Sequence, residues 1–351
     1  MICWRAMRIL WFAGLLACSL ASAGQTPLAP LPTDPESMMR AAASSYNLEA
    51  PDSKPWHMRV TYQLYDAKEQ PAESGSLEYW WVSPERNRQT LTRGSAVSSR
   101  WQTAGGKYLW VSRGRFNFAE TGLRDQFLSA IPAPDTFAKT TFLKEEVKFG
   151  TTQAPCAMLV PKGLRMDVGP VEPGLFPTYC FDPTAPVLVA RLAWGAPTIG
   201  YGRFVLFHGH PLAGSVTEYE SGKKILSAKL EGMNDISVDD PALTPAPDAT
   251  DRPLDESVGV ASGVMAGKRL GGSNPVYPQQ AKENRTSGTV VLRALIGTDG
   301  RIHNLRLVSA PALSLAVAAI QAVQAWTYQP YLLNGNPVEV DTQVNVVFSL
   351  G

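Results

Sequence analysis

The last strand-like segment of the chain limits the fold more than any other feature. From Val338 to Leu350, apolar side chains recur at alternate positions, and mostly polar side chains lie between them. Successive side chains of a strand point to opposite sides, so this pattern predicts a strand with one buried face and one wet face. A buried face needs a covering layer, which the residues before it must supply.

The preceding residues predict a hairpin and a helix. Gly288–Ile296 alternates in the same way, the turn sequence "GTDG" at 297–300 reverses the chain, and residues 302–309 form a second strand. Pro311 suits a helix start, and apolar residues then follow at helical spacing: Leu313, Val317, Ile320, Val323 and Trp326. The order strand, strand, helix, strand predicts one helix packed on a small antiparallel sheet.

These motifs together resemble a known family. "NPVYPQQA", "SGTVVLRALIGTDGRI", "LVSAP", "AVQAWTYQP" and "NGNPVEVDTQVNVVFSL" follow one another as in the C-terminal domain of the TonB family, over residues 273–351. The resemblance implies a bacterial envelope protein that couples inner-membrane proton-motive force to outer-membrane transporters. It also implies that the domain captures a short transporter segment as an added strand.

The resemblance also implies which residues bind. The family's motif around Tyr-Pro corresponds to Tyr277 and Pro278, and the recipient edge corresponds to the last strand: Gln343, Val344, Asn345, Val346, Val347 and Phe348. A purely structural alternative stays open, in which Tyr277 packs on the sheet and Pro278 only starts it. The chain differs from the family's energy transducers in two respects. Transducers keep an N-terminal transmembrane helix followed by a long spacer, whereas this chain has a short signal-like segment and a folded domain there.

Residues 24–233 predict a second domain of short strands, so the fold class is α+β. We expect a large antiparallel, half-barrel-like sheet with two helices, one starting at Asp34-Pro35 and one in "NFAETGLRDQFLSAI". Six tryptophans are expected to help hold the curved sheet around an apolar interior: Trp56, Trp80, Trp81, Trp101, Trp110 and Trp194. The pattern resembles LolA-like carriers of lipoproteins, and a scaffold with a filled core is the alternative.

Residues 234–272 separate the two domains. Asp235 to Glu256 carries seven acids against one arginine and contains four prolines. Such a segment buries little apolar surface, so we expect an extended, semi-stiff linker.

The N-terminal residues predict export. Arg5 and Arg8 precede an apolar run at 9–20 and a small-residue cleavage site at 21–23, which together indicate a signal peptide over residues 1–23. "LLAC" resembles a lipobox, so lipidation of Cys18 is the alternative to simple cleavage. Only Cys156 and Cys180 then remain; one disulfide is expected in an oxidising compartment, and two buried free thiols are the alternative.

Charge and motifs exclude several classes of function. A formal net charge of +1 gives no basic surface for nucleic acid. His208 and His210 flank Gly209 without a third ligand, so no metal site is expected. His57 and His303 stand isolated in predicted strands, which indicates surface positions. The sequence contains no GxSxG, HExxH, Walker or Rossmann pattern, so we expect neither an enzyme nor a cofactor.

The expected protein therefore lies in the periplasm or cell envelope of a Gram-negative-type bacterium. Its C-terminal domain would bind an outer-membrane transporter or other envelope protein by strand addition and support transport. One alternative is a carrier that holds a lipid or lipoprotein in the N-terminal domain. Another is a structural module that uses its free sheet edge to form a homodimer.

Overall fold

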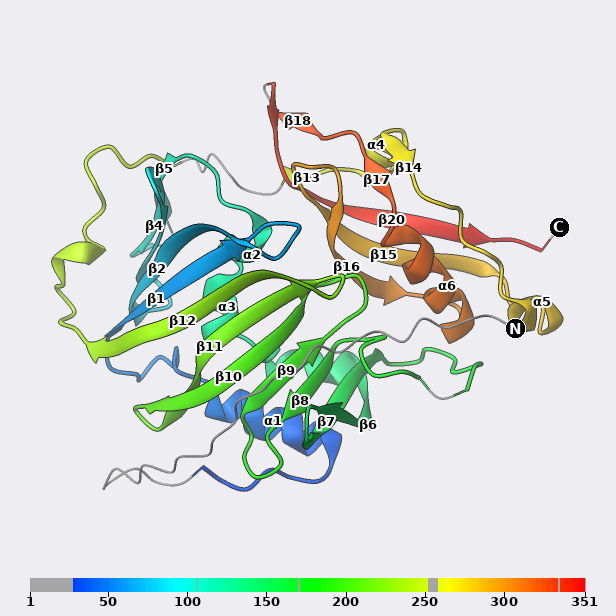
Figure 1. Ribbon diagram of the computed structural model, residues 1–351, viewed down its shortest axis with the longest axis horizontal. Coiled ribbons are helices and arrows are strands. Elements are labelled where there is room, and N and C mark those ends of the chain that lie inside the picture. Colours follow the sequence, from blue (N-terminus) through cyan, green and yellow to red (C-terminus); the bar gives the residue numbers. More distant parts are fainter. Residues whose placement is uncertain (1–27, 106, 170, 252–257, 334, 351) are drawn as a thin grey trace.

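The computed structural model describes residues 28–350 apart from 106, 170, 252–257 and 334, and it contains two sheet domains (Figure 1). The predicted signal peptide and Cys18 lie outside the described residues. The larger domain is built on twelve strands and the smaller on four. This agrees with the predicted α+β class, because the protein has a large antiparallel sheet, several helices and a separate small C-terminal sheet.

The large sheet is antiparallel and open, in the order β5-β4-β3-β2-β1-β12-β11-β10-β9-β8-β7-β6. Two meanders are joined where β1 pairs with β12. The strands are β1 (Trp56–Tyr65), β2 (Pro71–Ser83), β3 (Arg86–Arg93), β4 (Ala96–Thr103), β5 (Lys107–Arg113), β6 (Thr140–Phe149), β7 (Thr152–Pro161), β8 (Thr178–Phe181), β9 (Leu188–Leu192), β10 (Thr198–Phe207), β11 (His210–Glu220) and β12 (Lys223–Asp235).

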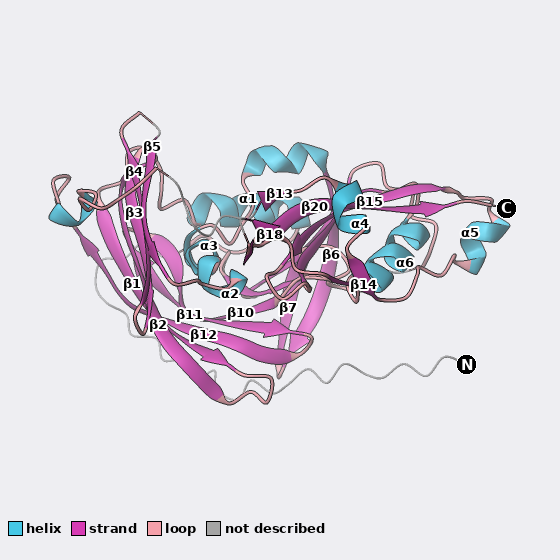
Figure 2. Ribbon diagram, turned by 90° about the horizontal axis from the view of Figure 1, so that it is seen from above, coloured by secondary structure: helices cyan, strands magenta, loops and turns pink. Residues whose placement is uncertain are grey.

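Helices fill the concave side of this curved sheet (Figure 2). They are α1 (Pro35–Ser45), α2 (Phe118–Thr121), α3 (Leu123–Leu128) and the 3₁₀ helix η1 (Pro134–Lys139). The start of α1 is as predicted, because the Asp34 carboxylate accepts the Ser37 N–H at 2.8 Å and Pro35 occupies the first turn. The second predicted helix is split, since Gly122 ends α2 and starts α3.

The tryptophans do not all line the interior. Trp56 and Trp81 are buried in the core that the helices cover. Trp80 and Trp101 lie on the outer face instead, with the guanidinium of Arg88 between their rings at 4.6 and 4.8 Å. The expectation of six inward tryptophans was therefore wrong for this pair, because neighbouring residues of one strand face opposite sides.

The predicted disulfide is confirmed. Cys156 on β7 and Cys180 on β8 are directly opposite one another in the ladder, and their α-carbons are 4.0 Å apart. Both residues are fully buried. The bond therefore ties together two strands near one end of the large sheet.

The first part of the acidic linker lies against the large domain. It contains the 3₁₀ helix η2 (Pro241–Leu243), and the Ala242 carbonyl accepts hydrogen bonds from Arg88 and Trp101 at 3.1 and 3.0 Å. Leu243 is buried, and Thr250 pairs with Trp110 as an isolated bridge at the β5 edge. The sequence predicted little burial for this part of the linker. It nevertheless packs on the large domain, because the outer tryptophan and arginine side chains offer it hydrogen-bond donors and an apolar surface.

The small domain has the predicted order of strand, strand, helix and strand, with short additions. Its sheet order is β13-β20-β15-β16. The elements are β13 (Val258–Gly259), α4 (Ser262–Ala266), β14 (Arg269–Gly271), α5 (Gln279–Glu283), β15 (Gly288–Ile296), β16 (Ile302–Ser309), α6 (Leu313–Val323), β17 (Thr327–Tyr328), β18 (Leu332–Leu333), β19 (Asn336–Pro337) and β20 (Val340–Phe348). Gly300 closes the β15–β16 turn at φ 77°, where a side chain would collide with the Tyr328 carbonyl.

Candidate functional site

The two outer strands of the small sheet have different surroundings. β16 lies against the large domain: Leu305 packs on Gly195, and Leu307 packs with the buried Met158 and Phe176. β20 lies on the other side of β15, with which it pairs from Gly288 opposite Phe348 to Ile296 opposite Val340. The edge of β20 is therefore the one directed away from the large domain (Figure 1).

Only the first part of the β20 edge is paired among the described residues. β13 runs parallel to it, with Val258 opposite Val340 and Gly259 opposite Asp341. The Val258 N–H donates to the Glu339 carbonyl at 2.8 Å, and the Val260 N–H donates to the Asp341 carbonyl at 3.1 Å. No described strand pairs with residues 343–348 on this side.

The direction of the backbone groups follows from this pairing. Glu339 and Asp341 point their carbonyls to the β13 side, and backbone direction alternates along a strand. Gln343, Asn345 and Val347 therefore present their N–H and C=O groups on the open side. Their side chains lie on the wet face, and Val347 is 70% exposed. Such a row of unpaired groups is a template for an added strand.

The predicted binding residues fall into two sets in the structure. Gln343, Asn345 and Val347 are exposed, whereas Val344, Val346 and Phe348 are buried against the core. Buried side chains of a recipient strand support the sheet rather than contact a partner directly. We call residues 343–348 the open segment of β20.

Tyr277 and Pro278 lie at one end of the open segment. The Tyr277 ring meets the Phe348 ring edge-on at a centroid distance of 5.3 Å, and its hydroxyl donates to the Thr286 carbonyl at 2.7 Å. Pro278 precedes α5 as its N-cap residue. The Tyr-Pro motif therefore adjoins the predicted edge, with the tyrosine used to pack its end.

A hollow of about 430 Å³ marks the other end of the open segment. It is lined by Gly259, Val260, Arg293, Asp341, Thr342 and Gln343. Arg293 donates through Nε to Asp341 at 2.7 Å, and this hydrogen bond lowers the pKa of the Asp341 carboxyl and raises that of the Arg293 guanidinium. The hollow is thus bordered by the backbone at the edge of β20 and by the Arg293–Asp341 ion pair on the solvent-exposed face of the sheet.

The loop between β7 and β8 holds the small domain on the large one. The Asp167 carboxylate accepts the N–H and the hydroxyl of Ser314, at 2.9 and 2.7 Å, in the first turn of α6. The Arg165 carbonyl accepts the Leu313 N–H at 2.9 Å, and its guanidinium donates to the Thr286 hydroxyl. Apolar side chains from both domains surround these bonds, including the buried Leu175, Phe176 and Leu313.

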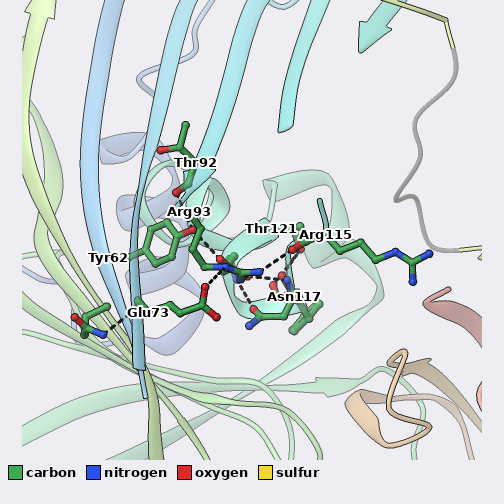
Figure 3. Close-up of polar contacts among 10 residues, drawn as sticks. Tyr62, Glu73, Thr92, Arg93, Arg115, Asn117 and Thr121 are labelled. Carbon is green, nitrogen blue, oxygen red and sulfur yellow. Dashed lines mark hydrogen bonds and ion pairs between the residues drawn. The ribbon is translucent and has the colours of Figure 1, made fainter. Parts of the chain in front are cut away.

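A second hollow, of about 560 Å³, lies between the domains, and several of the charged groups that line it form ion pairs with one another. Arg93, which lines it, forms an ion pair with the buried Glu120 carboxylate behind the wall, and this carboxylate also accepts the Tyr62 hydroxyl at 2.7 Å (Figure 3). Arg93 also contacts Glu73 and donates to the Arg115 carbonyl. This saturated network holds loop 113–118 in place.

His303 lines the same hollow, and the sequence prediction for this residue was wrong. Expected as an isolated surface residue, it pairs with Asp299 at 3.0 Å and with Glu220 of the large domain at 3.2 Å. The hydrogen bonds that the His303 ring donates to these two carboxylates, with that to Asp299 the stronger cause, raise the pKa of His303 to about 10. The signal for Asp299 was present in the turn sequence, but Glu220 is 83 residues away along the chain.

The remaining candidate groups do not form a second site. His208 pairs with Asp235 at 2.7 Å, and His210 bonds the Ser45 carbonyl at 2.8 Å, so the two histidines have separate partners. Among the described residues, no three His, Cys, Asp or Glu side chains are placed to hold a metal ion. The described helices include none with the length and apolarity needed to cross a membrane.

Comparisons with solved structures give low similarity for the larger part of the chain. A putative outer membrane lipoprotein-sorting protein domain from Vibrio parahaemolyticus is 9% identical with a TM-score of 0.36, and covers 59% of this chain and 97% of its own. A LolA superfamily protein from Nitrosomonas europaea is 8% identical with a TM-score of 0.35, with the same shares covered. A DUF1329 family protein from Desulfovibrio piger is 11% identical with a TM-score of 0.33, and covers 58% of this chain and 94% of its own.

These values are too low to carry an argument about function. No curated protein matches the chain. The family comparison agrees with the motifs, since residues 273–350 match the family described as Gram-negative bacterial TonB protein C-terminal. The small domain is therefore similar to the C-terminal domain of Gram-negative TonB proteins.

Proposed function

We propose that this is an exported bacterial envelope protein whose small domain binds a protein partner by strand addition at the open segment of β20. The observation that supports it is the row of backbone groups on Gln343, Asn345 and Val347, which no described strand pairs. An extended peptide gains main-chain hydrogen bonds at such an edge. The proposed role is binding, without a catalytic step.

The proposed partner is a segment of an outer-membrane transporter, as the family match at residues 273–350 suggests. Loop 162–177 and α6 connect the two domains through hydrogen bonds and apolar contacts. A partner held on β20 would therefore be connected to the large domain through the small one. The periplasm is the proposed compartment, which suits the buried disulfide.

A substitution on the open side of β20 tests this proposal. Val347→Pro removes an N–H that points outward and leaves the inward-pointing groups of Val346 and Phe348 in place. A photoreactive residue at Asn345 should capture a transporter segment in cells, and Val347→Pro should reduce this capture about tenfold, equivalent to about 1.4 kcal/mol. Val347→Thr keeps the N–H and is the matched control, with capture near the original level.

Two results would reject the proposal. Equal capture by the proline and threonine variants would show that the edge is not the binding surface. Capture of only a second copy of the chain would favour the homodimer instead. Circular dichroism and thermal unfolding of both variants exclude loss of the fold as the cause.

The lipid or lipoprotein carrier remains a prediction for the large domain. Its concave side holds a continuous cluster of buried side chains from α1, α3 and the strands. A bound acyl chain would have to separate the helices from the sheet. Mass spectrometry of the purified protein tests this, because copurified lipid would support a carrier and its repeated absence would argue against one.

A further inference from the structure

The β20 edge is shared with a segment of the same chain. Beyond its backbone hydrogen bonds, β13 is held where it leaves the edge, because the Thr342 hydroxyl donates to the Val260 carbonyl at 2.7 Å. These residues connect the linker to the small domain and pair with a strand about 80 residues further along the chain. β13 therefore occupies the position that a partner strand would take next to Val340 and Asp341.

The segment after β13 fixes this arrangement. Residues 262–266 form α4, which packs against β20, and Met265 is 1% exposed within the core of the small domain. Moving β13 away from the edge would pull on this buried side chain. Full burial of a methionine side chain is stabilising, because it removes apolar surface from water, and this favours the position of so short a strand next to β20.

We propose that β13 is an end stop for the partner strand. This proposal rests on the proposed function. β13 stays paired with β20 when the partner binds, so the partner strand can pair only with the six residues Gln343 to Phe348. Three outward-facing residues offer three N–H and three C=O groups. The fitting partner is an extended segment that pairs over about six residues, a common strand length.

The hollow beside β13 explains how the partner strand ends. Gly259 has open space where a side chain would be, and Val260, Thr342 and Gln343 form the adjoining walls. The end of the added strand lies in this hollow, next to the Arg293–Asp341 pair. A partner that pairs further along β20 would meet β13.

Position-by-position photocrosslinking in the full-length protein tests the end stop. A photoreactive residue is placed in turn at Asp341, Gln343, Asn345 and Val347. We expect partner capture from 343, 345 and 347, with at least tenfold less from 341. Partner capture from 341 at the level of 345 would overturn the proposal, because the partner would then have replaced β13.

A covalent lock gives the second measurement. Gly259 and Asp341 face each other in register, so Gly259→Cys with Asp341→Cys can be joined by a disulfide that fixes β13. Capture from Asn345 should change less than twofold on locking, relative to Asp341→Cys alone. Loss of capture on locking would overturn the end stop while leaving strand addition intact. Absence of partner capture at every position would overturn strand addition and the end stop together.

Discussion

Asp167 of the large domain caps helix α6 of the small domain by accepting both the N–H and the hydroxyl of Ser314. The cap of a helix is usually supplied by its own chain neighbours, whereas these two residues are 147 positions apart. The Asp167 side chain and Ser314 are both almost fully buried, so this cap lies inside the domain contact, away from water. One carboxylate thus contributes to helix stability and to domain docking.

Replacing this carboxylate should affect both properties. Asp167→Ala removes the acceptor of two hydrogen bonds and should lower the free energy of unfolding by about 1 to 2 kcal/mol. Amide exchange at the start of α6 should rise as well. Asp34→Ala, which removes the cap of α1, is the matched control and should destabilise the protein without changing exchange in α6. Equal exchange in α6 for the two variants would contradict a docking role of Asp167.

His303 should make stability depend on alkaline pH. Its pKa rises from 6.5 to about 10 on folding, first because of Asp299 and then because of Glu220. The folded state binds the proton more tightly, so the contribution is complete below pH 6.5 and is lost as pH rises through about 10. Subtracting the unfolding free energies of His303→Gln from those of the original protein isolates this dependence. The range from about pH 6 to about pH 11 spans both pKa values of His303. A difference in unfolding free energy that stays constant over this range would contradict the ion pairs of His303 with Asp299 and Glu220.

Glu218 should also make the protein less stable as pH rises, but through a penalty that appears over a lower pH range. It is 1% exposed, its Oε1 has no hydrogen-bond partner among the described residues, and burial raises its pKa to about 7. An acid with a raised pKa costs stability as pH rises from its unfolded value of 4.5 through about 7. Glu218→Gln should therefore stabilise the protein above neutral pH, by up to about 3 kcal/mol, and change little at pH 4. Destabilisation at pH 8 would instead show that the charged carboxylate has a favourable partner.

The disulfide should stabilise the large domain by restricting its unfolded chain. The two cysteines are 24 positions apart, and a loop of this size contributes about 3 kcal/mol on the chain-entropy model. Replacing both Cys156 and Cys180 by alanine should lower the urea midpoint accordingly. After denaturation in a reductant, the original protein should show the same midpoint as the double variant. A midpoint unchanged by both treatments would mean that the reduced strands pair as stably as the linked ones.

Local patterns in the sequence were sufficient to predict the order strand, strand, helix, strand in the small domain. The alternation in β15 and β20 and the glycine-containing turn between β15 and β16 depend on residues close together in the chain. The Asp34 cap of α1 is equally local, and Cys156 and Cys180, the two cysteines outside the predicted signal peptide, left only one pairing. A change in composition likewise predicted the linker, since residues 235–256 carry acids and prolines in place of periodic apolar residues.

The tertiary structure decided which surfaces remain available. β13 has two residues and no periodicity, so no local pattern distinguishes it from linker, and its pairing with β20 depends on the backbone that folding brings near. The contacts of His303 with Glu220 and of Asp167 with Ser314 likewise join residues distant in sequence. Their energies come from burial and from charges placed within hydrogen-bond distance, which exist only after the domains dock. Sequence alone therefore determined that the small sheet has a last strand suited to pairing, and the three-dimensional structure determined that only part of its edge is open.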